Sequence, residues 1–214
     1  IGLFSLVGTP YAFKFVWAPL IDRLPLPVLD RAMGRRRSWM LVSQVGVLLS
    51  IFLLAWSDPN ASPWATAGAA VLVAFWSATQ DIVIDAYRIE LLEDEEQGAG
   101  SATTQLGYRI ALWIVDALAL LLPTFIPWPY VLSIIALFGF VGIATTFYAH
   151  EPHSEKHAVT AGGGSWLSEA VIRPFREFVA HRGWVLILLF ALFYKYGDAL
   201  GGTMARPFYL QMGF

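Results

Sequence analysis

The chain has 214 residues, of which 57% are hydrophobic and only 14% are charged. A soluble domain usually carries about 25% charged residues, so the composition excludes an ordinary soluble domain and indicates an integral membrane protein. The net charge of −2 distinguishes no class of partner, and the absence of cysteine excludes disulfides and thiolate metal sites. We predict no cofactor, no metal and no nucleic-acid partner.

Six hydrophobic stretches are long enough to cross a bilayer as helices, which takes about 20 mostly apolar residues. In chain order they are Ile1–Leu20, Trp39–Trp56, Pro63–Tyr87, Ala99–Leu122, Trp128–Ala149 and Trp184–Tyr209. Proline and tryptophan mark several of their edges, which fits the aromatic belt at the membrane surface. The predicted fold class is therefore all-α, a polytopic transmembrane helical bundle with six spans.

The basic residues are concentrated in the connections on one side of these spans. Five arginines lie between the first and second spans, Arg88 follows the third, and four more cations lie between the fifth and sixth. The connections Ser57–Ser62 and Pro123–Pro127 contain none. The positive-inside rule then places the basic connections in the cytoplasm and both chain ends, Ile1 and Phe214, on the outer, periplasmic side.

The chain begins with Ile rather than Met, and both ends fall in hydrophobic sequence, so we expect an internal piece of a longer protein. Gly162–Gly164 is typical of a flexible linker, and Trp166–Val179 is typical of an amphipathic helix on the membrane surface. We predict a five-span bundle over residues 1–149, a cytoplasmic linker over 150–183 and the first span of a second bundle over 184–214. Such a linker is typical of transporters built from repeats.

Two aspartates lie inside the third span, Asp81 and Asp85. An ionised carboxylate there costs at least ~2.5–3.5 kcal/mol on insertion scales, which suggests that these groups are needed. Together with Arg88 they share one helix face, in the cytoplasmic part of the span. Burial and a neighbouring carboxylate both favour the protonated form, so the pair is the candidate for proton coupling. A structural salt bridge is an equal alternative for Asp85, and for Lys14 we favour a side chain that reaches the membrane surface.

Polar residues in other spans are candidates for the substrate path. Arg109 could hold a substrate carboxylate as a bidentate fork, or it could neutralise Asp81 or Asp198. Lys195 lies near the midplane of the last span, where it could line the path or pair with Asp198 within one helix. The full set of candidates for this path is Gln80, Tyr108, Arg109, Asp116, Lys195 and Asp198.

The connection between the first two spans places acidic and basic residues around a glycine. The glycine allows a tight turn, and the arginines can bind helix carbonyl ends, carboxylates and lipid phosphates. These residues and one arginine after the third span form the candidate cytoplasmic gate, which comprises Asp22, Arg23, Gly34, Arg35, Arg36, Arg37 and Arg88. The polar residues from His150 to His157 are interpreted as a solvated loop.

The run Asp22-Arg23 with Gly34-Arg35-Arg36-Arg37 resembles the cytoplasmic signature of the major facilitator superfamily. Further segments narrow this resemblance to the AmpG-type muropeptide permeases, over nearly the whole chain: Lys14–Arg23, Ser77–Tyr87, Gly98–Gly100, Leu106–Arg109 and Tyr194–Ala199. The resemblance implies a monomeric, proton-driven importer in the bacterial inner membrane. It implies that the substrates are anhydro-muropeptides, the glycopeptides released by cell-wall turnover.

Three alternatives compete with this interpretation. A related transporter of another anionic substrate, such as acetyl-CoA, shares part of the aspartate segment, and a non-transporting membrane sensor would keep the same fold. An intramembrane aspartyl protease is disfavoured, because Asp81 and Asp85 lie on one helix and no Gly-X-Gly-Asp signature occurs. We therefore predict a secondary transporter that works by alternating access, and not an enzyme.

Overall fold

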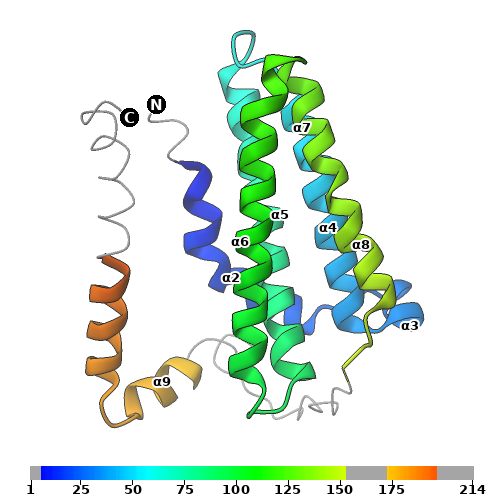
Figure 1. Ribbon diagram of the computed structural model, residues 1–214. Coiled ribbons are helices and arrows are strands. Elements are labelled where there is room, and N and C mark those ends of the chain that lie inside the picture. The colour runs from blue at the N-terminus through cyan, green and yellow to red at the C-terminus, as the bar shows by residue number, and fades with distance from the viewer. Residues whose placement is uncertain (1–5, 153–172, 197–214) are drawn as a thin grey trace. The chain divides into compact units, whose positions relative to one another are not determined.

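The structure is a computed structural model that describes residues 6–152 and 173–196, and these residues form helices and no strands. The chain divides into two compact units, Ile1–Ala158 and Val159–Phe214. In the first unit, long helices lie side by side (Figure 1). The described part of the second unit contains α9 (Arg173–Ala180) and the apolar helix Trp184–Tyr196.

The first unit contains η1 (Leu6–Gly8), α2 (Thr9–Arg23), α3 (Leu29–Met33), α4 (Arg35–Ala55), α5 (Pro63–Leu91), α6 (Gln97–Leu121), η2 (Leu122–Thr124), α7 (Trp128–Leu137) and α8 (Gly139–Tyr148). Within the described residues, four stretches are long and apolar enough to cross a membrane: α4, α5, α6 with η2, and α7 with α8. α7 and α8 continue along one line with a turn at Phe138, so they form one span (Figure 1).

The predicted all-α class is confirmed, and the second to fifth predicted spans correspond to these four stretches. Two helices extend further at their polar ends than hydrophobicity predicts. α4 begins at Arg35 rather than Trp39, and α5 ends at Leu91 rather than Tyr87. The extra turns carry charged side chains that pair with one another, as described below. The last part of the predicted sixth span, residues 197–209, lies outside the described residues.

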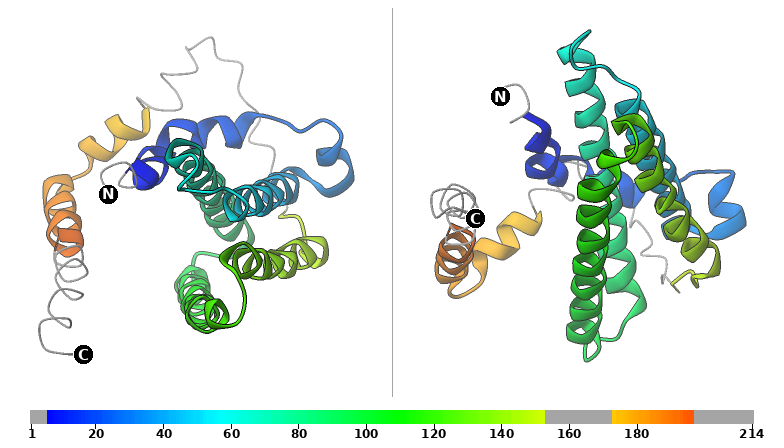
Figure 2. Two further views of the ribbon diagram at one scale, coloured as in Figure 1. Left: turned by 90° about the horizontal axis from the view of Figure 1, so that it is seen from above. Right: turned by 45° about the horizontal axis from the view of Figure 1, so that its top comes forward.

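α4 and α5 form the middle of the first unit. α4 packs against α3, α5, α7 and α8, and α2 packs against α5. Seen from above, α2 lies on one side of α4 and α5, whereas α6, α7 and α8 lie on the other (Figure 2). α6 contributes no buried residue. The contacts that position the site therefore run through α4 and α5.

Small residues bring α4 and α5 close together, as is usual for helices packed in a membrane. α5 buries Ala67, Ala74 and Ala78. On α4, Gly46 lies so near Trp76 of α5 that a Cβ at this position would overlap the indole ring. The side chain of Trp76 thus fits against bare α4 backbone, and this contact fixes how closely the two helices approach.

A buried polar contact joins α4 to α8. Thr146 donates a hydrogen bond from Oγ1 to Oε1 of Gln44 at 3.0 Å, and both side chains are buried. Gly142 leaves room for the amide group of Gln44, which would touch a Cβ at that position. Since a buried polar group without a partner is costly, this bond fixes the register of α8 on α4.

The packing of Gly46 against Trp76 predicts a stability difference between two glycine substitutions. Gly46→Ala inserts a methyl group into the indole ring and should lower the free energy of unfolding by about 1–3 kcal/mol. Gly68→Ala on α5 is the matched control, because a Cβ there meets nothing within 4 Å. The control should be neutral or stabilising by up to about 1 kcal/mol. Thermal unfolding of the full-length protein in detergent measures both, and equal midpoints would contradict this packing.

Candidate functional site: two polar clusters in the helix bundle

A buried arginine joins the ends of three helices. Arg36, in the first turn of α4, is only 6% exposed. Its Nη1 donates to Oδ1 of Asp22 at 2.6 Å, at the end of α2. Its Nε donates to Oε2 of Glu90 at 3.0 Å and its Nη2 to Oε1, at the end of α5. Arg35 adds a bond from Nη1 to the backbone oxygen of Asp22 at 2.6 Å. We call Asp22, Arg35, Arg36 and Glu90 the helix-end cluster.

The energetics of this cluster follow from burial. A bidentate guanidinium–carboxylate pair is stronger and geometrically more specific than a single hydrogen bond. Removing one partner of a buried ion pair is costly, because the other charge is left without compensation. Since Arg36 is the most buried member, the cluster holds the ends of α2, α4 and α5 in one arrangement.

A glutamate that follows α8 caps the start of α4. The carboxylate of Glu151 accepts the backbone N–H of Arg36 at 2.9 Å and that of Arg37 at 3.1 Å. A carboxylate at a helix N-terminus satisfies free N–H groups and interacts favourably with the helix dipole. Gly34 makes this possible: its φ is +85°, and the side chain of Glu151 occupies the space that a Cβ would need.

The end of α8 is bound in return by side chains of α4 and α5. Arg37 donates from Nε to the carbonyl of Thr146 at 3.0 Å and from Nη2 to the carbonyl of Phe147 at 2.8 Å. Tyr87 donates from its hydroxyl to the carbonyl of His150 at 2.7 Å. Carbonyls at the end of a helix lack partners within the helix, so these bonds fix α8 against its neighbours.

A second polar cluster lies near the middle of α5, where it faces α2. The hydroxyls of Tyr11 and Ser77 are 2.6 Å apart. Asp81 follows one turn later on α5 and is partly buried. It interacts electrostatically with Lys14 of α2 and with Asp85. Within the part of the chain that the structure describes, Asp81 forms no hydrogen bond and no direct ion pair. We call Tyr11, Lys14, Ser77 and Asp81 the Asp81 cluster.

An indole hydrogen bond fixes α2 beside this cluster. Trp17 donates from Nε1 to Oγ1 of Thr79 at 3.1 Å, and Thr79 is 2% exposed. Thr79 donates in turn to the carbonyl of Phe75 at 2.8 Å. The rings of Trp17 and Phe75 lie 5.0 Å apart. The face of α5 next to Asp81 is therefore held rigidly against α2.

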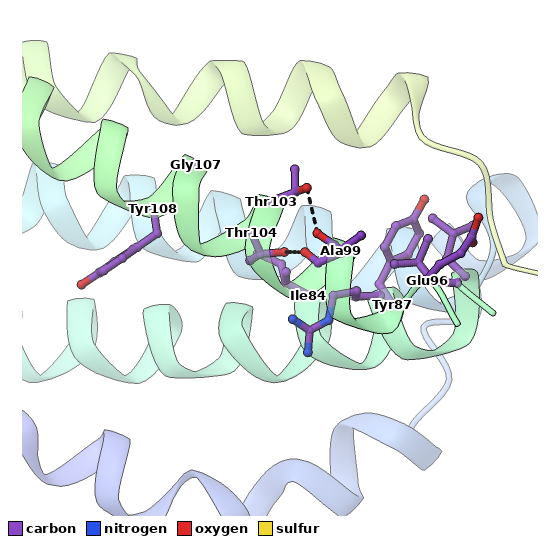
Figure 3. Close-up of a pocket in the computed structure, with 12 residues that line it drawn as sticks. Ile84, Tyr87, Glu96, Ala99, Thr103, Thr104, Gly107 and Tyr108 are labelled. Carbon is purple, nitrogen blue, oxygen red and sulfur yellow. Dashed lines mark hydrogen bonds between the residues drawn. The ribbon is translucent and has the colours of Figure 1, made fainter. Parts of the chain in front are cut away.

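Arg88 lies in a groove between α5 and α6 and is not part of the helix-end cluster. Its Nη2 is 3.6 Å from Oδ1 of Asp85, and its Nε is buried without a hydrogen-bond partner in the described structure. The groove has a volume of about 600 Å³. Figure 3 shows Thr103, Thr104 and Tyr108 of α6 along it. Both threonines donate to carbonyls of their own helix at 2.9 Å, so their hydroxyls are already satisfied.

Most of the predicted gate residues come together at one end of the bundle. Asp22, Arg35 and Arg36 form the helix-end cluster, and Gly34 and Arg37 lie beside it at the contact between α4 and α8. Arg23 is exposed in the last turn of α2. Among the predicted gate residues, only Arg88 lies in the groove toward α6. It pairs with Asp85, as expected if that aspartate forms a structural salt bridge rather than carrying protons.

The predicted substrate-path residues are more dispersed. Gln80 is partly buried on α5, whereas Tyr108, Arg109 and Asp116 are exposed on α6. Neither Arg109 nor Asp116 forms an ion pair with any residue in 6–152 or 173–196. Lys195 is exposed on the helix Trp184–Tyr196 of the second unit. Asp198, the predicted partner of Lys195, lies outside the described residues.

Two carboxylates that the structure places at the helix ends, those of Glu90 and Glu151, are not among the predicted site residues. Glu90 follows the apolar part of the third span, and Glu151 falls in a stretch interpreted as solvated. A signal for Glu90 is available in the sequence, because a helix that continues past Tyr87 brings it to the level of the arginine run. No comparable signal exists for Glu151, whose role depends on where α8 ends relative to α4.

This arrangement defines the class of the protein. Membrane-length helices with ion-paired ends, and with carboxylates inside one span, form a multi-pass membrane protein. The chain belongs to the Major Facilitator Superfamily, whose family model matches residues 1–214. This is a superfamily of transporters and not of enzymes.

Several relatives match over the whole chain. It is 39% identical to an uncharacterized protein of Haemophilus influenzae, 38% identical to the anhydromuropeptide permease of Escherichia coli K12 and 33% identical to putative transporter AmpG 4 of Rickettsia conorii. The match covers 49%, 42% and 52% of those proteins, respectively. The chain thus spans about half the length of the curated relatives it matches. No solved structure matches it.

The helix-end cluster predicts that Arg36 contributes far more to stability than an exposed arginine. Arg36→Gln leaves Asp22 and Glu90 without their shared cation and should lower the free energy of unfolding by about 3 kcal/mol. Arg31→Gln is the control, since Arg31 is exposed on the neighbouring α3 and should change it by less than about 0.5 kcal/mol. Thermal unfolding of the full-length protein measures both. A similar loss in the two variants would show that the cluster does not hold the helices together.

Proposed function

We propose that the complete protein is a proton-coupled secondary transporter, which imports anhydro-muropeptides across the bacterial inner membrane by alternating access. The substrate class comes from the 38% identity to the anhydromuropeptide permease of Escherichia coli. The observation that carries the proton coupling is the carboxylate of Asp81. It lies inside a membrane-length helix and, within the described residues, has no direct ion pair.

Protonation of Asp81 drives the cycle in this proposal. An ionised carboxylate inside the span is costly, and a protonated one is much less so. The bundle therefore exchanges between outward-facing and inward-facing states when Asp81 carries a proton. Asp85 contributes less to proton coupling, because its carboxylate is exposed and forms an ion pair with Arg88 at 3.6 Å. The proton enters from the periplasm and leaves to the cytoplasm.

The helix-end cluster acts as the cytoplasmic gate. The positive-inside rule places this basic end of the bundle in the cytoplasm. Here Arg36 joins α2, α4 and α5, while Glu151 and Arg37 add α8. An end that is cross-linked by charged hydrogen bonds moves as one body, which is the requirement for a bundle that rocks during transport.

Cations along the helices bind the anionic groups of the substrate. Arg109 is exposed on α6 and has no ion pair among the described residues, so its guanidinium is available for a carboxylate. Lys195, exposed on the helix Trp184–Tyr196, is the other candidate cation for the substrate path. Gln80, Tyr108 and Asp116 contribute hydrogen bonds to the sugar and peptide. The transporter works as a monomer.

Replacement of Asp81 tests the proton coupling. Full-length protein with Asp81→Asn should lose the dependence of anhydro-muropeptide uptake on the proton gradient, and uptake driven by that gradient should fall at least tenfold. Asp58→Asn is the matched control, because Asp58 is exposed in the connection before α5. Radiolabelled uptake into cells that lack the native transporter measures both. Normal, gradient-dependent uptake by Asp81→Asn would exclude this role, and parent protein that takes up acetyl-CoA instead would exclude the substrate.

A further inference from the structure

Lys14 and Asp81 lie at the same depth of two neighbouring helices that run in the same direction. Both α2 and α5 end at the helix-end cluster, where Asp22 and Glu90 meet at Arg36. At a rise of about 1.5 Å per residue, Lys14 lies ~12 Å before Asp22 and Asp81 lies ~13 Å before Glu90. The two charged residues are therefore level with each other across the contact between α2 and α5.

The neighbouring contacts turn the two residues toward each other. The hydroxyls of Tyr11 and Ser77 meet at 2.6 Å between the two helices. Lys14 follows Tyr11 by three residues and Asp81 follows Ser77 by four, and both spacings stay on one helix face. Lys14 is partly buried and interacts electrostatically with Asp81 without a direct ion pair.

The helix geometry argues against a lysine that reaches the membrane surface. The Cα–Cβ bonds of a helix tilt toward its N-terminus, so the side chain of Lys14 leaves the backbone away from the basic end of α2. It lies about two turns before the end of the helix. A cation among apolar helices is costly, as a carboxylate is, and therefore requires a function or a partner.

Few other charges act on this pair. Asp85 interacts with Asp81 along α5, and the hydroxyl of Tyr11 lies on α2 beside it. From α6, the hydroxyl of Tyr108 interacts electrostatically with Tyr11, and this group is neutral. α4 has no charged residue after the arginines of its first turn. Among the described residues, Lys14 is thus the cation that interacts with Asp81.

We propose that Lys14 binds an anionic group of the substrate, and that its charge becomes available for this when Asp81 is protonated. The inference rests on the proposed transport function and names a binding residue and the chemistry that it selects. While Asp81 is ionised, its charge balances that of Lys14. A proton on Asp81 removes this balance, and Lys14 then attracts a carboxylate. By linkage, the bound carboxylate favours the proton on Asp81 to the same extent, so both are carried together.

The test is equilibrium binding of radiolabelled anhydro-muropeptide to the detergent-solubilised full-length protein over a range of pH. The affinity of the parent should fall as pH rises and Asp81 loses its proton. Lys14→Gln should bind at least tenfold more weakly at low pH and lose the pH dependence. Lys14→Arg should retain both the affinity and its pH dependence. Asp81→Asn should bind tightly at every pH, and Arg173→Gln on the exposed α9 serves as the control for loss of a cation.

Two results would overturn the role of Lys14: Lys14→Gln with the affinity and pH dependence of the parent, or Asp81→Asn with an unchanged pH dependence. Parent protein that binds no anhydro-muropeptide would contradict the proposed function instead. A comparison of unfolding temperatures needs no substrate, so it tests the coupling of Lys14 and Asp81 even if the proposed function is wrong. The double variant Lys14→Gln/Asp81→Asn should unfold at a higher temperature than the sum of the two single changes predicts. Additive changes would show that the two residues are not coupled.

Discussion

A buried charge in a membrane protein needs a partner of opposite charge. Arg36 meets this requirement because its buried guanidinium donates hydrogen bonds to both Asp22 and Glu90. These carboxylates lie in the last turns of two different helices, so the side chain of Arg36 fixes the ends of α2 and α5 relative to α4. The cap that Glu151 provides at the start of α4 adds the end of α8 to the same point. Four helices are thereby aligned at one end of the bundle.

The alignment at this end determines what lies deeper in the bundle. Because α2 and α5 run in the same direction and end at a common level, the hydroxyls of Tyr11 and Ser77 meet midway along them. Asp81, one turn further on, interacts electrostatically with Lys14. The close contact at Gly46 holds α5 against α4 and leaves its other faces toward α2 and α6. The structural charges of the helix ends and the charges available for transport are thus separated by about 2.5 turns of helix.

The hydrophobic stretches predicted the four membrane-length helices, since length and apolar composition alone determine them. The arginine run and the aspartates were also predicted as important, because charge next to or inside a span is rare. The partners of these charges could not be predicted in the same way. Glu90 and Glu151 act on Arg36 from 54 and 115 residues away, and only the packing of the helices brings them there. The position of Arg88 toward α6 likewise depends on which face of α5 meets α2.

In the proposed transport cycle, substrate and proton cross the membrane together. The most direct test reconstitutes the full-length protein in liposomes with a pH-sensitive dye in the lumen and no imposed pH gradient. Addition of anhydro-muropeptide outside should acidify the lumen as the substrate enters, at a rate proportional to its uptake. Entry of the substrate with no change in the pH of the lumen would contradict the account.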